Sequence, residues 1–298
     1  MRVLVIFPGA IGDLICLAPC LWHLRRKFPH AALELMARGE LVRLATGRLG
    51  INRGESIDRS EVAALFVEFV RAPDASVTLF GGYQKIYSFF AAGNPVFRRM
   101  LQRACAGDVT FHNFRPESSG HIAAAYLESI GAGTDKIDYR IELLNSDLEA
   151  AKAALRAVKL IENDCAVIFP GSGGPAKNWP LVNYLELVPR LPLKAVFVIG
   201  PAEEDYAPLI NRAGLAAISN LELPTVAAIA KLARFFIGND SGVSHLAAAA
   251  GARGVVLFGP TDPDRWRPLG AVRVISRMPF SSLSVDLVSA TVADLARG

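Results

Sequence analysis

The chain has 298 residues, of which 52% are hydrophobic and 20% are charged, and its formal net charge is +4. This length suits two domains, and the apolar share supports packed cores and argues against disorder. The mild positive charge favours acidic small ligands or an anionic membrane surface, and it is too weak to indicate nucleic acid.

The cysteines and the N-terminus indicate a cytoplasmic protein. The four cysteines form no C-x-x-C pair, so we expect neither a disulfide framework nor a zinc site. The first twenty residues imitate a signal peptide, but Gly12, Asp13 and two prolines interrupt their apolar run. No run of about 18 apolar residues, the length that spans a membrane, occurs.

The first residues predict a βαβ unit and therefore a parallel sheet. Arg2–Phe7 is a continuous apolar run, as expected of a strand buried on both faces. An amphipathic helix follows, in which Pro19 should produce a kink or mark the first turn. Ala31–Ala37 is the second strand. Further on, Ala75–Phe80 could be a strand, whereas the runs Phe97–Cys105 and His121–Gly131 favour helices. Gly81–Pro116 has no clear period and predicts loops and short helices that face a ligand.

The second half alternates strands and helices regularly. Ser146 and Asp147 can cap its first helix. The strand-like runs are Cys165–Gly171, Lys194–Gly200, Arg234–Asp240 and Arg253–Gly259. The helical runs are Leu181–Arg190, Glu203–Ala213, Pro224–Ala233 and Ser241–Ala250. The sequence "VIFPG" opens both halves, at Val5–Gly9 and Val167–Gly171. We therefore predict an α/β protein of two doubly wound domains, 1–144 and 145–298.

Ligands of such folds bind beyond the carboxyl ends of the strands, so the loops there are candidate sites. In the first, "PGAIGDL", Gly9 and Gly12 permit a sharp turn and Asp13 stands at the mouth of a helix. Asp13 is either an N-cap or a carboxylate that takes a proton from a hydroxyl, and spacing alone favours the cap. In the second, "PGSGGPAKNWP", Ser172 and Gly173 offer open amides and Lys177 a positive charge, which suits a phosphate. A plain surface lysine before a helix is the alternative.

The other two loops also suit a diphosphate. In "IGNDSGVSHLAAAAG", Asp240 or Ser241 caps a helix whose N-terminal amides favour an anion. Asp240 itself should contact a hydroxyl or an amine, and a lone helical histidine such as His245 is more often structural. In "LFGPTDPDRW", Gly259 permits close backbone approach and Thr261 can donate to a phosphate.

Other functional classes find no support in these motifs. Asp262 and Asp264 resemble a metal pair, but no third ligand is near them in the sequence. No G-x-G-x-x-G follows a first strand and no G-x-S-x-G occurs, which argues against a dinucleotide oxidoreductase and an α/β-hydrolase.

Taken together, these loops resemble glycosyltransferase family 9, the lipopolysaccharide heptosyltransferases. The resemblance rests on "GAIGDLICLAPCLWHLRRKFPHAALELMA", "PGSGGPAKNWP" and "GNDSGVSHLAAAAGARGVVLFGPTDP". It implies a GT-B architecture, two Rossmann-like domains facing a central cleft. The first domain would bind the acceptor and the second a nucleotide-sugar, usually an ADP-heptose, and the last helix could pack back on the first domain.

The resemblance also implies an inverting, metal-independent transfer without a cofactor. Asp13 matches the family's catalytic base, and Gly9 and Gly12 belong to the acceptor-side loop. The donor-binding residues would be Ser172, Gly173, Lys177, Asp240, Ser241, Gly242, His245, Gly259 and Thr261.

The implied partners are a nucleotide-diphosphate sugar and a lipid-linked or saccharide acceptor of the lipopolysaccharide core. Such an acceptor places the protein at the cytoplasmic face of the inner membrane, where the region Tyr83–Arg103 could lie against anionic headgroups. Two alternatives stay open from the residues alone. One is a nucleotide-sugar 2-epimerase on the same fold, and the other is a non-enzymatic nucleotide-sugar-binding protein.

Overall fold

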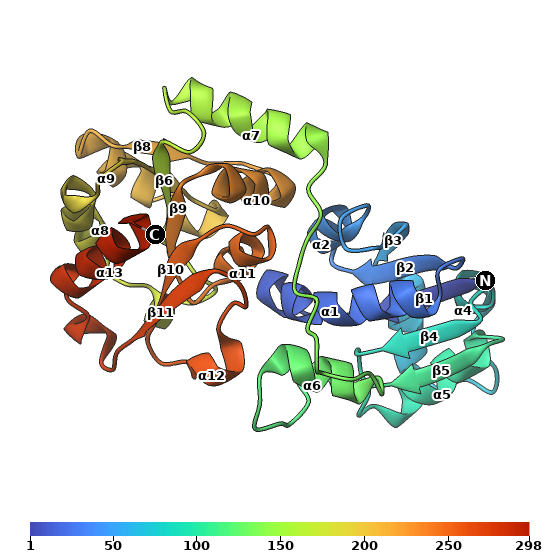
Figure 1. The fold of residues 1–298 in the computed structure, drawn as a ribbon. Helices are drawn as coiled ribbons and strands as arrows, with labels where there is room; N and C mark the ends of the chain where they lie inside the picture. The colour runs from blue at the N-terminus through green and yellow to red at the C-terminus, as the bar shows by residue number, and fades with distance from the viewer. Residues whose placement is uncertain (298) are drawn as a thin grey trace. The chain divides into compact units, whose positions relative to one another are not determined.

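A computed structural model describes residues 1–297, which form two compact units, Met1–Asp138 and the chain from Tyr139 onward (Figure 1). Each unit is a parallel β-sheet with helices between its strands. The predicted α/β class with two doubly wound, Rossmann-like sheets is thus confirmed. No helix within residues 1–297 combines the length and the apolar character needed to span a bilayer.

The first unit contains a five-stranded sheet in the order β3-β2-β1-β4-β5. Its strands are β1 (Arg2–Ile6), β2 (Ala32–Ala37), β3 (Arg53–Ser56), β4 (Lys85–Ser88) and β5 (Asp108–Phe111). Its helices are α1 (Ile11–Lys27), α2 (Gly39–Ala45), α3 (Ser60–Ala63), the 3-10 turn η1 (Ala64–Phe66), α4 (Asp74–Phe80), α5 (Pro95–Ala104) and α6 (Ile122–Ser129). The order of the strands reverses at β1, which lies between β2 and β4.

Helix α1 begins at Ile11 and continues through Pro19, so Pro19 does not mark its first turn. A proline lacks an N–H group, so the carbonyl group of Ile15 loses its helical partner there. The helix persists because its apolar face, which includes Leu14, Leu17 and Leu21, is fully buried.

Two expectations for the middle of this unit are wrong. Ala75–Phe80 lies in helix α4 and not in a strand, with Ser76 and Phe80 buried one helical turn apart. The stretch Gly81–Pro116 contains the strands β4 and β5, each only four residues long, beside the expected helix α5. Its aromatic side chains are mostly core residues: Tyr83, Tyr87, Phe89 and Phe97 are all buried. This stretch therefore contributes two strands and core side chains to the first unit.

A buried carboxylate ties three parts of the first sheet together. Glu34 of β2 is 1% exposed. It accepts hydrogen bonds from Arg2 Nε at 2.9 Å and Tyr83 Oη at 2.8 Å, and its Oε2 lies 3.0 Å from Arg53 Nε. Burial alone would raise the pKa of Glu34, but the bonds from Arg2, Arg53 and Tyr83 outweigh it and lower the pKa.

Glu34→Gln tests this network, because glutamine keeps an acceptor and loses the charge. A folded-state pKa below the ordinary 4.5 means that the charge stabilises the fold above that pH. This contribution is lost as the pH falls through the lower folded value. We expect Glu34→Gln to lose about 1–3 kcal/mol at pH 7, as is typical of hydrogen bonds to charged groups. Hydrogen exchange of the β1 and β2 amides at pH 7 and in acid measures the loss, which should shrink in acid.

Glu55→Gln is the matched control, since Glu55 on the neighbouring strand β3 pairs with Arg59 at the surface. This variant should change the exchange of β1 and β2 little at either pH. Equal losses in both variants, or a loss in Glu34→Gln that is the same at both pH values, would contradict the assignment.

The second unit contains a six-stranded sheet in the order β11-β10-β9-β6-β7-β8. Its strands are β6 (Cys165–Phe169), β7 (Lys194–Val198), β8 (Ala216–Ile218), β9 (Phe235–Asn239), β10 (Gly254–Phe258) and β11 (Val272–Ser276). Its helices are α7 (Asn145–Ala157), α8 (Leu181–Leu187), α9 (Tyr206–Arg212), α10 (Leu223–Leu232), α11 (Gly242–Ala249), α12 (Pro263–Trp266) and α13 (Val285–Arg297). Its 3-10 turns are η2 (Pro175–Lys177), η3 (Val188–Arg190), η4 (Pro201–Glu203) and η5 (Phe280–Ser282).

Alternate residues of the central strands supply two cores, one on each face of this sheet. Ile168 and Ile237 pack with α8, α9 and α13, whereas Val167 and Phe236 pack with α7, α10 and α11. The apolar face of α13 packs into the first of these two cores, where Val288 is fully buried. From the sequence, it was also possible that this helix packs back on the first domain. Strand order reverses between β6 and β9, so the loops after these two strands meet at the switch point.

The N-terminus of α7 corrects one expected cap. The helix begins at Asn145, one residue before Ser146. Asp147 reaches back from the first turn, where its carboxylate accepts a hydrogen bond from the Leu144 N–H group at 2.9 Å. The aspartate thus acts as predicted, although at the third helical position and not as the cap residue itself.

Candidate functional site

The side chain of Asn239 organises the switch point of the second sheet. Asn239 ends β9 and is fully buried. Its Oδ1 accepts hydrogen bonds from the Trp179 N–H group at 3.0 Å and the Tyr184 hydroxyl at 2.9 Å. Its Nδ2 donates to the Pro170 carbonyl group at 2.8 Å. One buried amide therefore fixes both ends of the loop 170–180, which follows β6.

The Trp179 side chain anchors this loop in the core of the second unit. Its ring is 1% exposed, packs edge-on against Tyr184 at 4.9 Å, and donates from Nε1 to the Leu283 carbonyl group at 3.0 Å. Sequence reasoning missed the roles of Asn239 and Trp179. The available signal was a polar residue directly at the end of the apolar strand "FFIGN".

Three residues predicted from three separate loops meet in one cluster, in which two of them bind the carboxylate of the third. Asp240, which is 5% exposed, follows β9. Its Oδ2 accepts a hydrogen bond from Lys177 Nζ at 2.7 Å and another from Thr261 Oγ1 at 2.5 Å. Lys177 follows β6 and Thr261 follows β10, so this cluster joins the ends of three neighbouring strands.

The charges of this cluster leave room for an anion. Asp240 alone would oppose a negative ligand, but Lys177 neutralises it. The ammonium group has three donors, and Asp240 uses one of them. The Lys177 side chain is 36% exposed, so its other donors can face a ligand.

The glycines around this cluster differ in whether the structure has room for a Cβ atom at their positions. A Cβ atom at Gly173 or Gly174 would meet no atom within 4 Å, so packing within the described chain does not require glycine there. The Ser172 hydroxyl donates to the Gly174 carbonyl group at 2.8 Å and shapes this turn. Gly259 is different, because a Cβ atom there would lie 2.9 Å from the Phe280 ring. Close packing against Phe280 is therefore sufficient reason for Gly259.

The N-terminus of α11 has amides that no side chain caps. Gly242 is its first residue and Ser241 is the N-cap, without a side-chain capping bond. The Ser241 hydroxyl lies 3.2 Å from that of Ser244, which donates to the Asn239 carbonyl group at 2.7 Å. The first turn of this helix therefore offers donors and a positive dipole end to an anion.

His245 belongs to the same helix, and its side chain is buried. Its Nδ1 lies 2.6 Å from the Tyr139 hydroxyl group, at the start of the second unit. This bond is of the structural kind that is common for helical histidines. Tyr139 was not singled out from the sequence.

In the first unit, Asp13 caps α1 from the third helical position and not as the N-cap residue, which is Ala10. It lies in the first turn of α1, where Oδ2 accepts from the Ala10 N–H group at 3.1 Å. Arg115 also binds it, with Nε and Nη2 at 3.2 and 3.1 Å from Oδ1 and Nη2 at 3.2 Å from Oδ2. The carboxylate is thus a capping group that is also paired with a cation, and no sequence motif marks Arg115.

The surroundings hold Asp13 firmly and Arg115 less so. A Cβ atom at Gly9 would lie 2.7 Å from Asp13 Cβ and 2.4 Å from the Phe7 ring, so the turn requires glycine there. Gly12 is the second residue of α1. Asp13 is 6% exposed, whereas the Arg115 side chain is 55% exposed. Three donor nitrogens bind the carboxylate, Ala10 N and Arg115 Nε and Nη2, so a new donor at Asp13 competes with them.

The two aspartates once considered as a metal pair have another role. Asp262 caps α12, where its Oδ1 accepts from the Asp264 N–H group at 2.9 Å. Within residues 1–297, no group of three or more histidine, cysteine, aspartate or glutamate side chains could hold a metal ion.

Known proteins match this chain over most of its length. Residues 120–286 match the model of glycosyltransferase family 9 (heptosyltransferase). The lipooligosaccharide heptosyltransferase 2 of Haemophilus influenzae is 34% identical, over 93% of this chain and 89% of that protein.

Two solved structures show the same fold. One is a family 9 glycosyltransferase from Veillonella parvula, with a TM-score of 0.82 and 19% identity, over 99% of this chain and 97% of the other. The other is the ADP-heptose lipopolysaccharide heptosyltransferase II of Escherichia coli, with a TM-score of 0.78 and 19% identity, over 100% and 99%. The predicted GT-B architecture is confirmed by this likeness. On the family match and the identity to the Haemophilus enzyme, the chain belongs to glycosyltransferase family 9, the heptosyltransferase family, and is a glycosyltransferase.

Proposed function

We propose that this chain transfers a heptose from an ADP-heptose donor to a saccharide acceptor of the lipopolysaccharide core, with inversion at the anomeric carbon. The observation that carries the proposal is the convergence of Lys177, Asp240 and Thr261 on the switch point of the second sheet. The similarity to an enzyme described as an ADP-heptose heptosyltransferase supports the choice of donor. In this proposal the second domain (145–298) holds the donor, and the first domain (1–144) binds the acceptor.

The donor side must stabilise a departing nucleoside diphosphate. Lys177 supplies a positive charge, and the uncapped first turn of α11 at Ser241 and Gly242 supplies backbone donors. The open turn at Ser172 and Gly173 lets a phosphate approach the backbone. Thr261 and Asp240 orient Lys177, while Gly259 and His245 support the loops by packing and by the bond to Tyr139.

The acceptor side must take a proton from the attacking hydroxyl group. We assign this step to Asp13, whose carboxylate lies at the end of the loop after β1. Because Arg115 contacts both oxygens of this carboxylate, we infer that it turns aside when the acceptor hydroxyl group binds. Arg115 is the partner that can move, since the Ala10 N–H group belongs to the backbone of the turn.

The acceptor would be lipid-linked, because the lipopolysaccharide core grows on a lipid at the inner membrane. The protein would then work in the cytoplasm, in peripheral contact with the anionic inner face of that membrane. The mild positive net charge supports such a contact.

Lys177→Ala should weaken ADP binding about ten- to a hundredfold, the usual worth of a hydrogen bond to a charged group. This variant also leaves the Asp240 carboxylate buried without its cation, which repels an anion and destabilises the unit. Lys177→Ala/Asp240→Asn removes that complication and should still bind ADP weakly. Asp240→Asn alone should bind ADP more tightly than the double variant, because it keeps the Lys177 charge. Calorimetric titration with ADP measures all three.

The pattern across the variants decides this assignment. If the double variant binds ADP as tightly as the parent, Lys177 does not contact the diphosphate. The weaker binding of Lys177→Ala then came from the unpaired negative charge of Asp240.

Asp13→Asn should lower the transfer rate about 10²–10⁴-fold, as expected when a positioned base is lost. Asparagine can still accept the Ala10 N–H bond, so the fold and ADP affinity should be kept. Asp13→Ala, by comparison, should also cost about 1 kcal/mol of stability through loss of the cap. Turnover and thermal unfolding of both variants check this.

An Asp13→Asn rate within a few-fold of the parent would remove Asp13 from the mechanism. Unchanged ADP affinity in that variant would show that the donor site is intact, so that only the assignment of the base had failed.

Transfer should continue in EDTA, because Lys177 and the α11 amides supply the positive potential that a metal ion would otherwise provide. The measurement is the initial rate with and without EDTA, followed by addition of Mg²⁺. A reaction that stops in EDTA and returns with Mg²⁺ would contradict a metal-independent mechanism.

A further inference from the structure

The first unit exposes a run of hydrophobic side chains, Phe66–Val70, which begins at the last residue of η1 and precedes α4. Phe66 is 41% exposed, Val67 53%, Phe69 44% and Val70 97%, and only Glu68 interrupts the run. Single exposed hydrophobic residues are normal, but several in succession indicate a surface that binds something. We call residues 66–70 the hydrophobic loop.

The hydrophobic loop is fixed in place by α5. The Phe66 ring packs against Phe97 and Phe90, with ring centroids 5.0 and 5.6 Å apart. Arg103 Nη1 donates to the Phe69 carbonyl group at 2.7 Å, and Arg99 pairs with Glu68 at 2.7 Å. The valines and Phe69 are therefore held outward by a defined structure.

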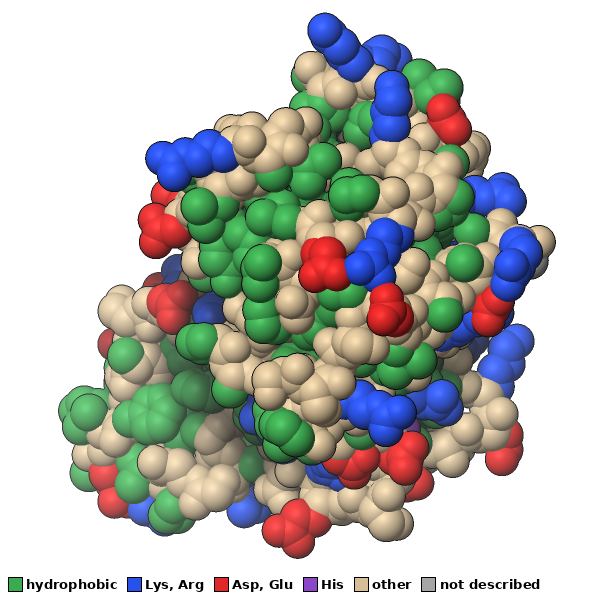
Figure 2. All heavy atoms as spheres, turned by 90° about the vertical axis from the view of Figure 1, so that its left-hand side faces the viewer, with side chains coloured by type: hydrophobic (Ala, Val, Ile, Leu, Met, Phe, Trp, Pro, Cys, Tyr) green, Lys and Arg blue, Asp and Glu red, His purple; other side chains and the backbone are tan. Residues whose placement is uncertain are grey.

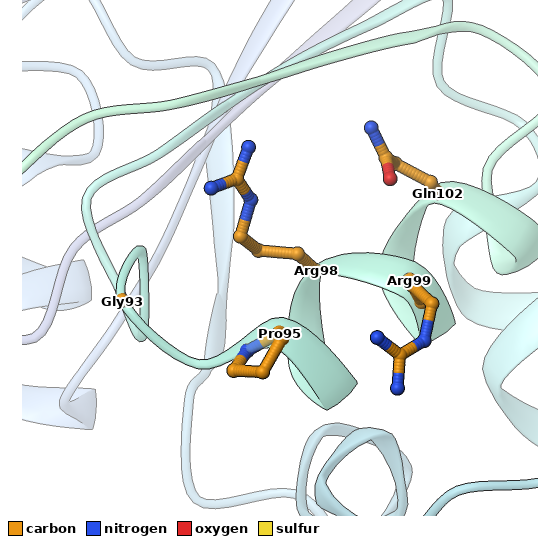
Figure 3. Close-up of a pocket in the computed structure, with 5 residues that line it drawn as sticks. All are labelled: Gly93, Pro95, Arg98, Arg99 and Gln102. Carbon is orange, nitrogen blue, oxygen red and sulfur yellow. The ribbon is translucent and has the colours of Figure 1, made fainter.

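Arginines lie beside this loop, where Arg99 and Arg103 contact it and Arg71 follows it. Arg98, Arg99 and Gln102 line a shallow surface pocket of about 280 Å³ on α5, in which Arg98 and Arg99 point in different directions (Figure 3) and Arg98 lies over the Phe111 ring at 5.0 Å. Arg71 follows the loop directly and is exposed, as is Arg103. The acidic residues within the loop, its flank to Asp74 and α5 are Glu68 and Asp74, so cations outnumber acids four to two.

The surface of the second unit offers a contrast. Its exposed large hydrophobic residues are scattered singly along the chain, at Leu144, Ile161, Val182, Leu209, Met278 and Leu287. Of these, Val182, Leu209 and Leu287 lie on the helices α8, α9 and α13. Charges of both signs lie among hydrophobic side chains on the face that carries these helices (Figure 2). Arg190, for example, pairs with Glu186 and Asp286. This surface is balanced in charge, whereas that of the hydrophobic loop is not.

We propose that the hydrophobic loop and the arginines around it form a docking surface for an anionic lipid bilayer. Val70 and Phe69 would enter the boundary between headgroups and acyl chains, and Arg71 and Arg103 would meet lipid phosphates. A second copy of the chain fits less well, because a two-fold contact would set arginines against arginines. This inference rests on the proposed function only for the reason to visit a membrane.

The surface differs from the one expected from the sequence. The aromatic residues of Tyr83–Arg103 are mainly buried, so that stretch offers lipid only its arginines. The apolar part comes instead from the preceding loop, which α5 holds against those arginines.

Flotation with vesicles tests the proposal without any transfer reaction. The full chain is mixed with phosphatidylcholine vesicles that contain or lack about one third phosphatidylglycerol. We expect binding to the anionic vesicles that weakens with salt, and little binding to the neutral ones. Val70→Asp should reduce binding at least tenfold, and Arg71→Gln should reduce it about fivefold. Val182→Asp is the matched control, since Val182 is 66% exposed on the second unit, and it should bind as the parent does.

Calorimetry with ADP accompanies each variant and should show no change, which separates a failure of this surface from a failure of the donor site. Absence of binding to anionic vesicles at low salt overturns the proposal, as does equal loss in Val70→Asp and Val182→Asp. Self-association that Val70→Asp abolishes, without vesicle binding, also overturns it and assigns the surface to a second copy.

Discussion

The buried carboxylate of Asp240 is the constraint on which the candidate donor site depends. A carboxylate that is 5% exposed must be paired, because an isolated charge in such a place is costly. Its partners come from other loops: Lys177 follows β6 and Thr261 follows β10. Folding the second unit therefore draws three strand ends together, and it leaves an ammonium group facing outward. The proposed donor binding therefore uses the ion pair that also supports the fold.

The neighbouring Asn239 extends this constraint into the core. Its amide oxygen and its amide nitrogen both form hydrogen bonds with the loop after β6, and the Trp179 side chain of that loop is buried. The first unit repeats the theme after its own central strand β1. Asp13 is buried there, accepts a backbone bond and pairs with the exposed Arg115. In both units an aspartate that follows a central strand is held by a cation from a distant part of the chain.

The sequence predicted the elements whose pattern is local. Strands β1, β6, β7, β9 and β10 are continuous apolar runs because helices cover both faces of the sheets. The edge strands β3, β5, β8 and β11 are only partly buried and lack such runs, so the sequence did not predict them. Ala75–Phe80 was misassigned because its valine, threonine and phenylalanine favour strands, and six residues are too few to show a helical period.

The same distinction explains the candidate site. Lys177, Asp240 and Thr261 were found because each follows a recognisable strand. Arg115 was not, because it meets Asp13 across 102 residues of sequence in a segment without a motif. Such contacts follow from the fold and cannot be read from spacing.

A crystal structure of the chain with ADP would show directly whether Lys177 and the start of α11 bind the diphosphate. We expect a phosphate oxygen within about 3 Å of Lys177 Nζ, the distance of a charge-assisted hydrogen bond, with the amides of Ser241 or Gly242 pointing at the diphosphate. ADP bound away from the ends of β6 and β9, with Lys177 still engaged only by Asp240, would contradict it.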